Sequence, residues 1–135
     1  MTAYGRPAGF WATLQTEMKA LNVLVVDDDP SIRSLLRIAL SLEEGVAEVR
    51  EADGGEDALR VCLDFTPDLV FLDFWMPFLD GAAVAARIKR LHPHVHIVAF
   101  SGVLDTKPDW ADDLYVKGDL PDLELVIDLV RAEAG

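Results

Sequence analysis

Short, unbroken apolar runs alternate along the chain with stretches of helical period. The runs are rich in β-branched and aromatic residues and occupy positions 23–26, 69–72, 97–100 and 114–116, with a weaker one at 46–49. Runs of this kind are typical of strands that are covered on both faces. The sequence therefore predicts five buried strands.

Between these runs the apolar residues follow the period of an α-helix. From Ile32 to Leu40 they recur at intervals of three and four, after Asp29 as a predicted N-cap and Pro30 as the first helical residue. The same spacing recurs at 58–65, at 84–91 and at 123–130. Strands that alternate with helices predict an α/β fold, with a mainly parallel sheet and helices on both faces.

In such a sheet a ligand site forms at the carboxyl ends of the strands, so the residues just beyond each run matter most. Asp27 and Asp28 follow the first run, Asp73 the third, Ser101 the fourth and Lys117 the fifth. Carboxylates suit a hard cation such as Mg²⁺, and a hydroxyl and an ammonium group suit a phosphoryl group. These residues predict a metal-assisted phosphoryl-transfer site.

Four motifs carry a resemblance to a known family. They are VVDDDP at 25–30, EADGGEDAL at 51–59, PDLVFLD at 67–73 and MPFLDG at 76–81. Because these motifs occur together and in this order, the chain resembles the receiver domains of bacterial two-component systems, over about residues 21–134. The resemblance implies a flavodoxin-like, doubly wound sheet of five parallel strands in the order 2-1-3-4-5.

The resemblance also implies a role for each site residue. Asp73 is expected to accept a phosphoryl group and to ligate Mg²⁺, or Mn²⁺, together with Asp28 and the backbone carbonyl of Trp75. Asp27 is expected to hold the ion through water. The Trp75 ring is expected to shield the acyl phosphate from hydrolysis. Ser101 and Lys117 are expected to contact the phosphoryl group.

The chain departs from the family pattern near its fifth strand. Gly118 stands where family members generally have proline after the lysine, which alters how Lys117 is presented. Lys117 follows Ser101 by only sixteen positions (117 − 101), so the intervening helix is expected to be short or missing. Leu114 stands where many members have an aromatic switch residue. Lys107, which proline does follow, is rejected as the site lysine because no apolar strand precedes it.

The function expected from this resemblance is that of a stand-alone response regulator. It would be phosphorylated by a histidine kinase or a histidine phosphotransfer protein, and would signal to a downstream protein or pass the group onward. It would not be an enzyme in the usual sense. Two alternatives stay open: a pseudo-receiver that acts without phosphorylation, and, ranked last, a phosphatase of the haloacid-dehalogenase type. The second rests on the acidic motif at 27–31 and leaves Asp73 unexplained.

The composition limits the classes of partner and the compartment that we expect for this protein. The net charge of −12 has the wrong sign for binding a phosphate backbone, so nucleic acid is not an expected partner. No run reaches the roughly 20 apolar residues of a membrane span, and no secretory signal pattern is present at the start. A lone Cys62 cannot form an internal disulfide and is expected in the core. These features favour a cytoplasmic protein.

Residues 1–20 are expected to form a partly helical N-terminal extension before a receiver domain at 21–134. Phe10, Leu14, Met18 and Leu21 trace one helical face. This face could dock on its own domain, or it could contact a partner protein or a second copy in a homodimer. A metal site at the three histidines of 92–96 is disfavoured, because Pro93 interrupts them at a connection between helix and strand.

Overall fold

The computed structural model describes residues 19–73, 80–101, 106–116 and 123–134. Its strands are β1 (Leu21–Val26), β2 (Val46–Ala52), β3 (Leu69–Asp73), β4 (His96–Ser101) and β5 (Asp113–Val116). Its helices are α2 (Pro30–Ser41), α3 (Gly55–Val61), α4 (Gly81–Leu91) and α5 (Leu123–Ala134). The predicted alternation of strands and helices is confirmed.

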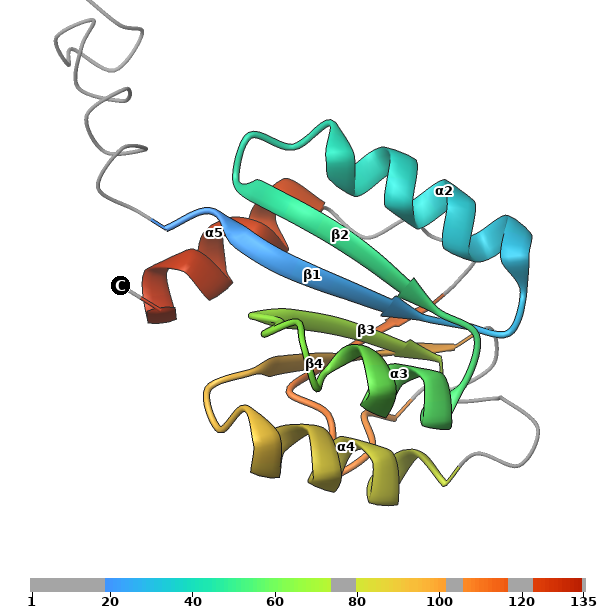
Figure 1. The fold of residues 1–135 in the computed structure, drawn as a ribbon. Coiled ribbons are helices and arrows are strands. Elements are labelled where there is room, and N and C mark those ends of the chain that lie inside the picture. The colour runs from blue at the N-terminus through green and yellow to red at the C-terminus, as the bar shows by residue number, and fades with distance from the viewer. Residues whose placement is uncertain (1–18, 74–79, 102–105, 117–122, 135) are drawn as a thin grey trace, which may run out of the picture.

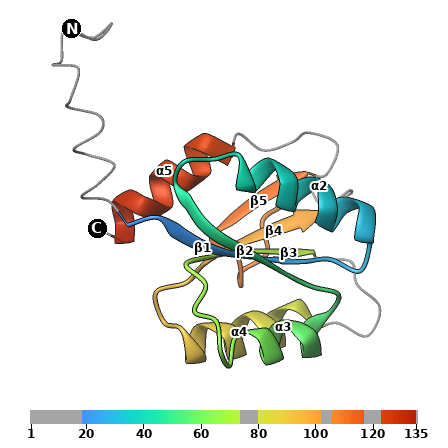
Figure 2. The ribbon, with the colours of Figure 1, turned by 45° about the horizontal axis from the view of Figure 1, so that its top comes forward.

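All the strands pair in parallel, in the order β2-β1-β3-β4-β5. Helices α2 and α5 cover one face of the sheet, and α3 and α4 cover the other (Figure 2). The structure thus confirms the flavodoxin-like fold with its 2-1-3-4-5 order. It also brings the carboxyl ends of β1 and β3 side by side, since Val26 pairs with Leu72.

Two apolar layers hold the helices to the sheet. Alternate residues of β1 point to opposite faces, so Leu24 and Val26 pack under α3 and α4 while Val23 and Val25 pack under α2 and α5. The same alternation in β3 splits its buried residues between the two layers. Burial on both faces explains why the strands appear in the sequence as continuous apolar runs.

The start of α2 follows the predicted signals. Asp29 is the N-cap, and its carboxylate accepts a hydrogen bond from Ser31 N at 2.9 Å, with Pro30 as the first helical residue. The start of α4 is capped in the same way, because Asp80 accepts from Ala82 N and Ala83 N at 3.1 and 3.3 Å. Each cap satisfies backbone N–H groups in the first turn of its helix.

Two elements differ from the predicted pattern. Helix α3 ends at Val61, so Phe65 lies after the helix, where its side chain is buried. The guanidinium carbon of Arg50 lies over the Phe65 ring, 4.8 Å from its centroid. Leu21 was predicted on an N-terminal helical face, and this is wrong, because it is the first residue of β1 and is fully buried. In both cases an apolar residue that fits a helical period is buried from outside a helix, Leu21 from β1 and Phe65 from the chain after α3.

Residues 106–112, which lead into β5, form turns, and this described part of the connection contains no helix. A short or missing helix after β4 was predicted, and the described residues agree with it. The remaining predictions for the extension, at 1–18, lie outside the described residues. The first described residue, Lys19, is held at the amino end of β1 by buried Arg131 of α5, whose Nε donates to Lys19 O at 3.0 Å.

Candidate functional site

The turn that follows β1 positions the first two acidic residues. Asp27 N continues the sheet by donating to Ala52 O at 3.1 Å, and Asp27 Oδ1 accepts from Asp29 N at 2.9 Å. Arg33 donates to the carbonyl oxygen of Asp27 at 2.7 Å. Asp27 is therefore fixed by its backbone and by its carboxylate, and it is only 1% exposed.

Asp73 is the last residue of β3, a strand with neighbours on both sides. It pairs with Phe100 of β4 and is 1% exposed. Val26 pairs with Leu72, the residues just before Asp27 and Asp73, and the carboxylates of these two aspartates offer oxygens within 4.8 Å of each other. A carboxylate at this buried strand end is costly unless a cation or hydrogen bonds compensate its charge.

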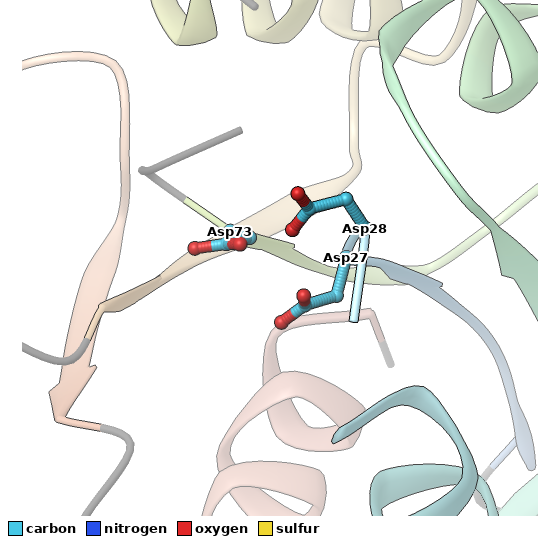
Figure 3. A group of neighbouring side chains, drawn as sticks. All are labelled: Asp27, Asp28 and Asp73. Carbon is cyan, nitrogen blue, oxygen red and sulfur yellow. The ribbon is translucent and has the colours of Figure 1, made fainter. Parts of the chain in front are cut away.

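The carboxylates of Asp27, Asp28 and Asp73 gather where β1 and β3 end (Figure 3). Each offers an oxygen within 4.8 Å of the others, with Asp28 exposed and the other two buried. Oxygens bound to one Mg²⁺ lie about 3 to 4 Å apart, given bonds of about 2.1 Å in an octahedron. Because the oxygens all lie within 4.8 Å of one another, this donor set is close enough to hold one hard cation.

The other predicted site residues are less fully described. Ser101 ends β4 and pairs with Val116, the residue before Lys117, so the backbone brings the two strand ends together. Trp75, Lys117 and Gly118, including the carbonyl ligand, the shielding ring and the altered lysine presentation, lie outside the described residues. Leu114 lies within β5 and pairs with Ala99, while the adjacent Tyr115 packs against the layer under α2 and α5.

The histidines do not form a metal site in the part of the chain that is described, where Asp27, Asp28 and Asp73 are the one group found with metal-ligand spacing. His92 Nε2 lies 2.9 Å from Cys62 O, and His96 Nε2 lies 2.7 Å from a carboxylate oxygen of Asp113. Both rings tie secondary-structure elements together. Cys62 is in the core as predicted, and burial raises the pKa of its thiol to about 11.

Two cavities lined by described residues lie away from the carboxylates. One of about 740 Å³ lies at the amino-end edge of the sheet, between Lys19, Asp68, His94 and Val130. Another, of about 530 Å³, lies between α3 and α4 and is lined by Asp53, Asp80 and Arg87 among others.

Comparison with known families decides what this site belongs to. Residues 23–114 match the model of the response regulator receiver domain. The chain belongs to this family. A receiver domain is a phosphoacceptor signalling module rather than a catalytic enzyme, and its acidic cluster is typical of a magnesium-binding receiver site. Among the helices that the structure describes, none has the length and apolar character needed to span a bilayer.

Several relatives support the assignment of this receiver domain. The chemotaxis protein CheY of Halobacterium salinarum is 36% identical over 84 residues, which are 62% of this chain and 68% of CheY. A protein-glutamate methylesterase/protein-glutamine glutaminase of Geobacter metallireducens is 36% identical over 87 residues, 64% of this chain. The chain spans only 25% of that protein and 38% of the regulator BvgA of Bordetella pertussis.

Solved structures give the same result. The response regulator TrrA of Thermotoga maritima, crystallised in complex with Mg(2+)-BeF, has a TM-score of 0.70 and 34% identity, covering 84% of this receiver domain and 99% of TrrA. A second structure holds TrrA in complex with the histidine kinase ThkA, with a TM-score of 0.68 and 33% identity, covering 84% of this chain and 98% of TrrA.

Proposed function

We propose that this receiver domain accepts a phosphoryl group on Asp73 in a reaction that requires Mg²⁺ or Mn²⁺. The observation that carries the proposal is the convergence of three carboxylates from two neighbouring strand ends within 4.8 Å. Three like charges at that separation repel one another, and a bound divalent cation offsets the repulsion. The complex of TrrA with Mg(2+)-BeF supports the same use of the site in a related chain.

Each carboxylate then has one task. Asp28 and Asp73 ligate the metal with the backbone carbonyl of Trp75, and Asp27 holds it through water. The bound cation neutralises charge on the incoming phosphoryl oxygens. An oxygen of Asp73 attacks phosphorus as the bond from phosphorus to the donor atom breaks, and the donor leaves with that electron pair. The product is an acyl phosphate on Asp73.

Ser101 and Lys117 act on the product. The Ser101 hydroxyl donates to a phosphoryl oxygen, and the Lys117 ammonium pairs with the acyl phosphate. The pairing of Ser101 with Val116 supports this, because it places the ends of β4 and β5 next to each other. Movement of Ser101 toward the phosphoryl group would bias the surface that partners recognise.

The donor is a phosphohistidine on a histidine kinase or a histidine phosphotransfer protein. The structure of TrrA with the kinase ThkA supports a partner of this class. The signal then passes to a downstream protein or, by onward phosphotransfer, to another carrier. The net charge of −12 disfavours direct binding to nucleic acid.

The test is the intact mass of the protein after incubation with Mg²⁺ and a small acyl-phosphate donor. We expect a single phosphoryl adduct that is lost in Asp73→Asn and when a chelator removes the metal. Asp80→Asn is the matched control, because it removes a carboxylate from the same connection while an asparagine still caps α4. An adduct that persists in Asp73→Asn would refute the proposed acceptor.

A pseudo-receiver is the second candidate. The turns at 106–112 favour it, because the connection between β4 and β5 departs there from the family pattern. The same measurement separates the two functions. A wild-type protein that neither takes up phosphoryl groups nor binds Mg²⁺ would be a binding module that acts without phosphorylation.

A further inference from the structure

The side chain of Arg33 reaches back from the first turn of α2 to the acidic turn at 27–29. Its Nη1 donates to the carbonyl oxygen of Asp27 at 2.7 Å, and its backbone N–H donates to Asp29 O at 3.1 Å. The side chain is only 19% exposed, so water competes little for this contact. Arg33 therefore joins α2 to the turn that carries two of the three clustered carboxylates.

Glu51 holds the guanidinium of Arg33 in this position. It lies in β2, where it pairs with Val25 of β1, and its Oε1 is 3.5 Å from Arg33 Nε. The second oxygen of the same carboxylate pairs with Arg37 Nε at 3.1 Å. The N–H groups of a guanidinium lie in one plane and point in different directions, so a single arginine can contact both the acidic turn and β2.

The carbonyl that accepts from Arg33 belongs to the peptide bond between Asp27 and Asp28. A peptide unit is planar, so a hydrogen bond to its oxygen restrains the plane in which the Cα atoms of both residues lie. Asp27 is also held by its N–H, which donates to Ala52 O, and by its carboxylate, which accepts from Asp29 N. The Arg33 contact extends this restraint to Asp28, the exposed member of the acidic cluster.

Restraint of this peptide unit matters because the clustered carboxylates repel one another. Oxygens of Asp27, Asp28 and Asp73 lie within 4.8 Å, and without a cation their repulsion favours conformations that spread them apart. A turn that is held in the gathered arrangement loses less conformational freedom when an ion binds. The charge of Arg33 acts in the opposite direction, since a cation near the cluster repels Mg²⁺, and pairing with Glu51 offsets that charge.

From these contacts we infer that Arg33 is a positioning residue for the proposed metal site, and that it acts through the carbonyl of Asp27. The inference rests on the proposed function and deepens it, because the ion that Arg33 assists is the one proposed for phosphoryl transfer to Asp73. Arg33 holds the peptide unit between Asp27 and Asp28 in the orientation that gathers their carboxylates with Asp73. Loss of this contact weakens metal binding.

The test is the dissociation constant of Mg²⁺, measured by titration calorimetry on the full chain. Arg33→Ala should raise it about tenfold, the low end of the effect of losing a group that orients a metal ligand. If Arg33 acted only through its charge, the same variant would bind Mg²⁺ more tightly, because a repelling cation would be gone. Arg33→Lys keeps the charge and one donor nitrogen, so it should recover part of the lost affinity.

Two control variants separate positioning from charge and from stability. Arg37→Ala removes the same charge from the same helix and from the same carboxylate of Glu51. It should change the Mg²⁺ dissociation constant by less than about twofold, because Arg37 is largely exposed and its charge is screened. Val126→Ala removes buried apolar atoms of α5 from the layer under α2 and α5. It should lower the free energy of unfolding and leave Mg²⁺ affinity unchanged.

Three outcomes are decisive. Weaker Mg²⁺ binding by Arg33→Ala, partly recovered by Arg33→Lys and absent from both controls, supports the inference. Unchanged or tighter binding by Arg33→Ala overturns it while the wild type still binds the metal, and so does a lysine that recovers nothing or an equal loss in either control. A wild type that binds no Mg²⁺ overturns the proposed function itself and this inference with it, so the wild-type titration distinguishes the two failures.

Discussion

The three carboxylates should make the metal-free domain less stable than it could be, and Asp28→Asn tests this. Two unit charges 4.8 Å apart repel by about 1 kcal/mol in water and by about 3.5 kcal/mol at an effective dielectric constant of 20. Asp28 faces both Asp27 and Asp73, but it is exposed, and its repulsion from Asp27 persists in part in the unfolded chain. We therefore expect Asp28→Asn to raise the free energy of unfolding by about 1 to 2 kcal/mol without metal.

Mg²⁺ should reverse this order. A cation that binds only the folded wild type at about 100 times its dissociation constant adds about 2.7 kcal/mol of stability. The variant has lost a proposed ligand and should gain much less. The assay is urea unfolding of both proteins, in a chelator and in a series of Mg²⁺ concentrations.

Asp64→Asn is the control, because it removes the same charge from an exposed position outside the acidic cluster. It should match the wild type in both conditions. The reasoning would be refuted if Asp28→Asn were less stable than the wild type in chelator. Equal stabilisation of both proteins by Mg²⁺ would refute the assignment of Asp28 as a ligand.

Three further predictions concern the scaffold. Asp29→Ala should cost about 1 kcal/mol of unfolding free energy through loss of the α2 cap, whereas Asp29→Asn should cost almost nothing in the same chemical denaturation. The Cys62 thiol, with a pKa raised to about 11, should be alkylated at pH 8 far more slowly in the folded protein than in denaturant, and equal rates would contradict its burial. The pKa of Asp112 is lowered on folding, so its ionised form stabilises the protein above the unfolded pKa, and this contribution is lost as pH falls through the folded pKa. Asp112→Asn should therefore cost about 1 kcal/mol at neutral pH and little in strong acid, as a pH series of thermal unfolding would show.

Most of the fold could be predicted because the signals that define it are local. Continuous apolar runs identified strands that are buried on both faces, and the Asp29-Pro30 pair identified the start of α2. The gathering of the carboxylates could be predicted from a geometric rule, because the carboxyl ends of parallel strands share one edge of the sheet. That rule brought Asp27, Asp28 and Asp73 together before any distance was known.

The predictions that were wrong concern residues whose positions depend on tertiary packing. Leu21 fits a helical period as well as a strand, and only pairing with Val46 of β2 decides between them. Phe65 likewise fits the period of α3 although the helix ends before it. The packing of Trp110 against Gly81 could not be predicted, because it joins residues far apart in the chain and neither residue alone signals it.

The hydrogen bond from Arg131 to Lys19 O has a practical consequence for sensor design. It fixes the point where the chain enters β1 beside α5, so the start of β1 and the end of α5 lie near one another (Figure 1), at the opposite end of β1 from Asp27. Dyes attached at those two positions would stay close whether or not Asp73 carries a phosphoryl group. A distance-based reporter should instead pair one of them with a dye on α4, whose first turn is joined to the chain that follows the acceptor.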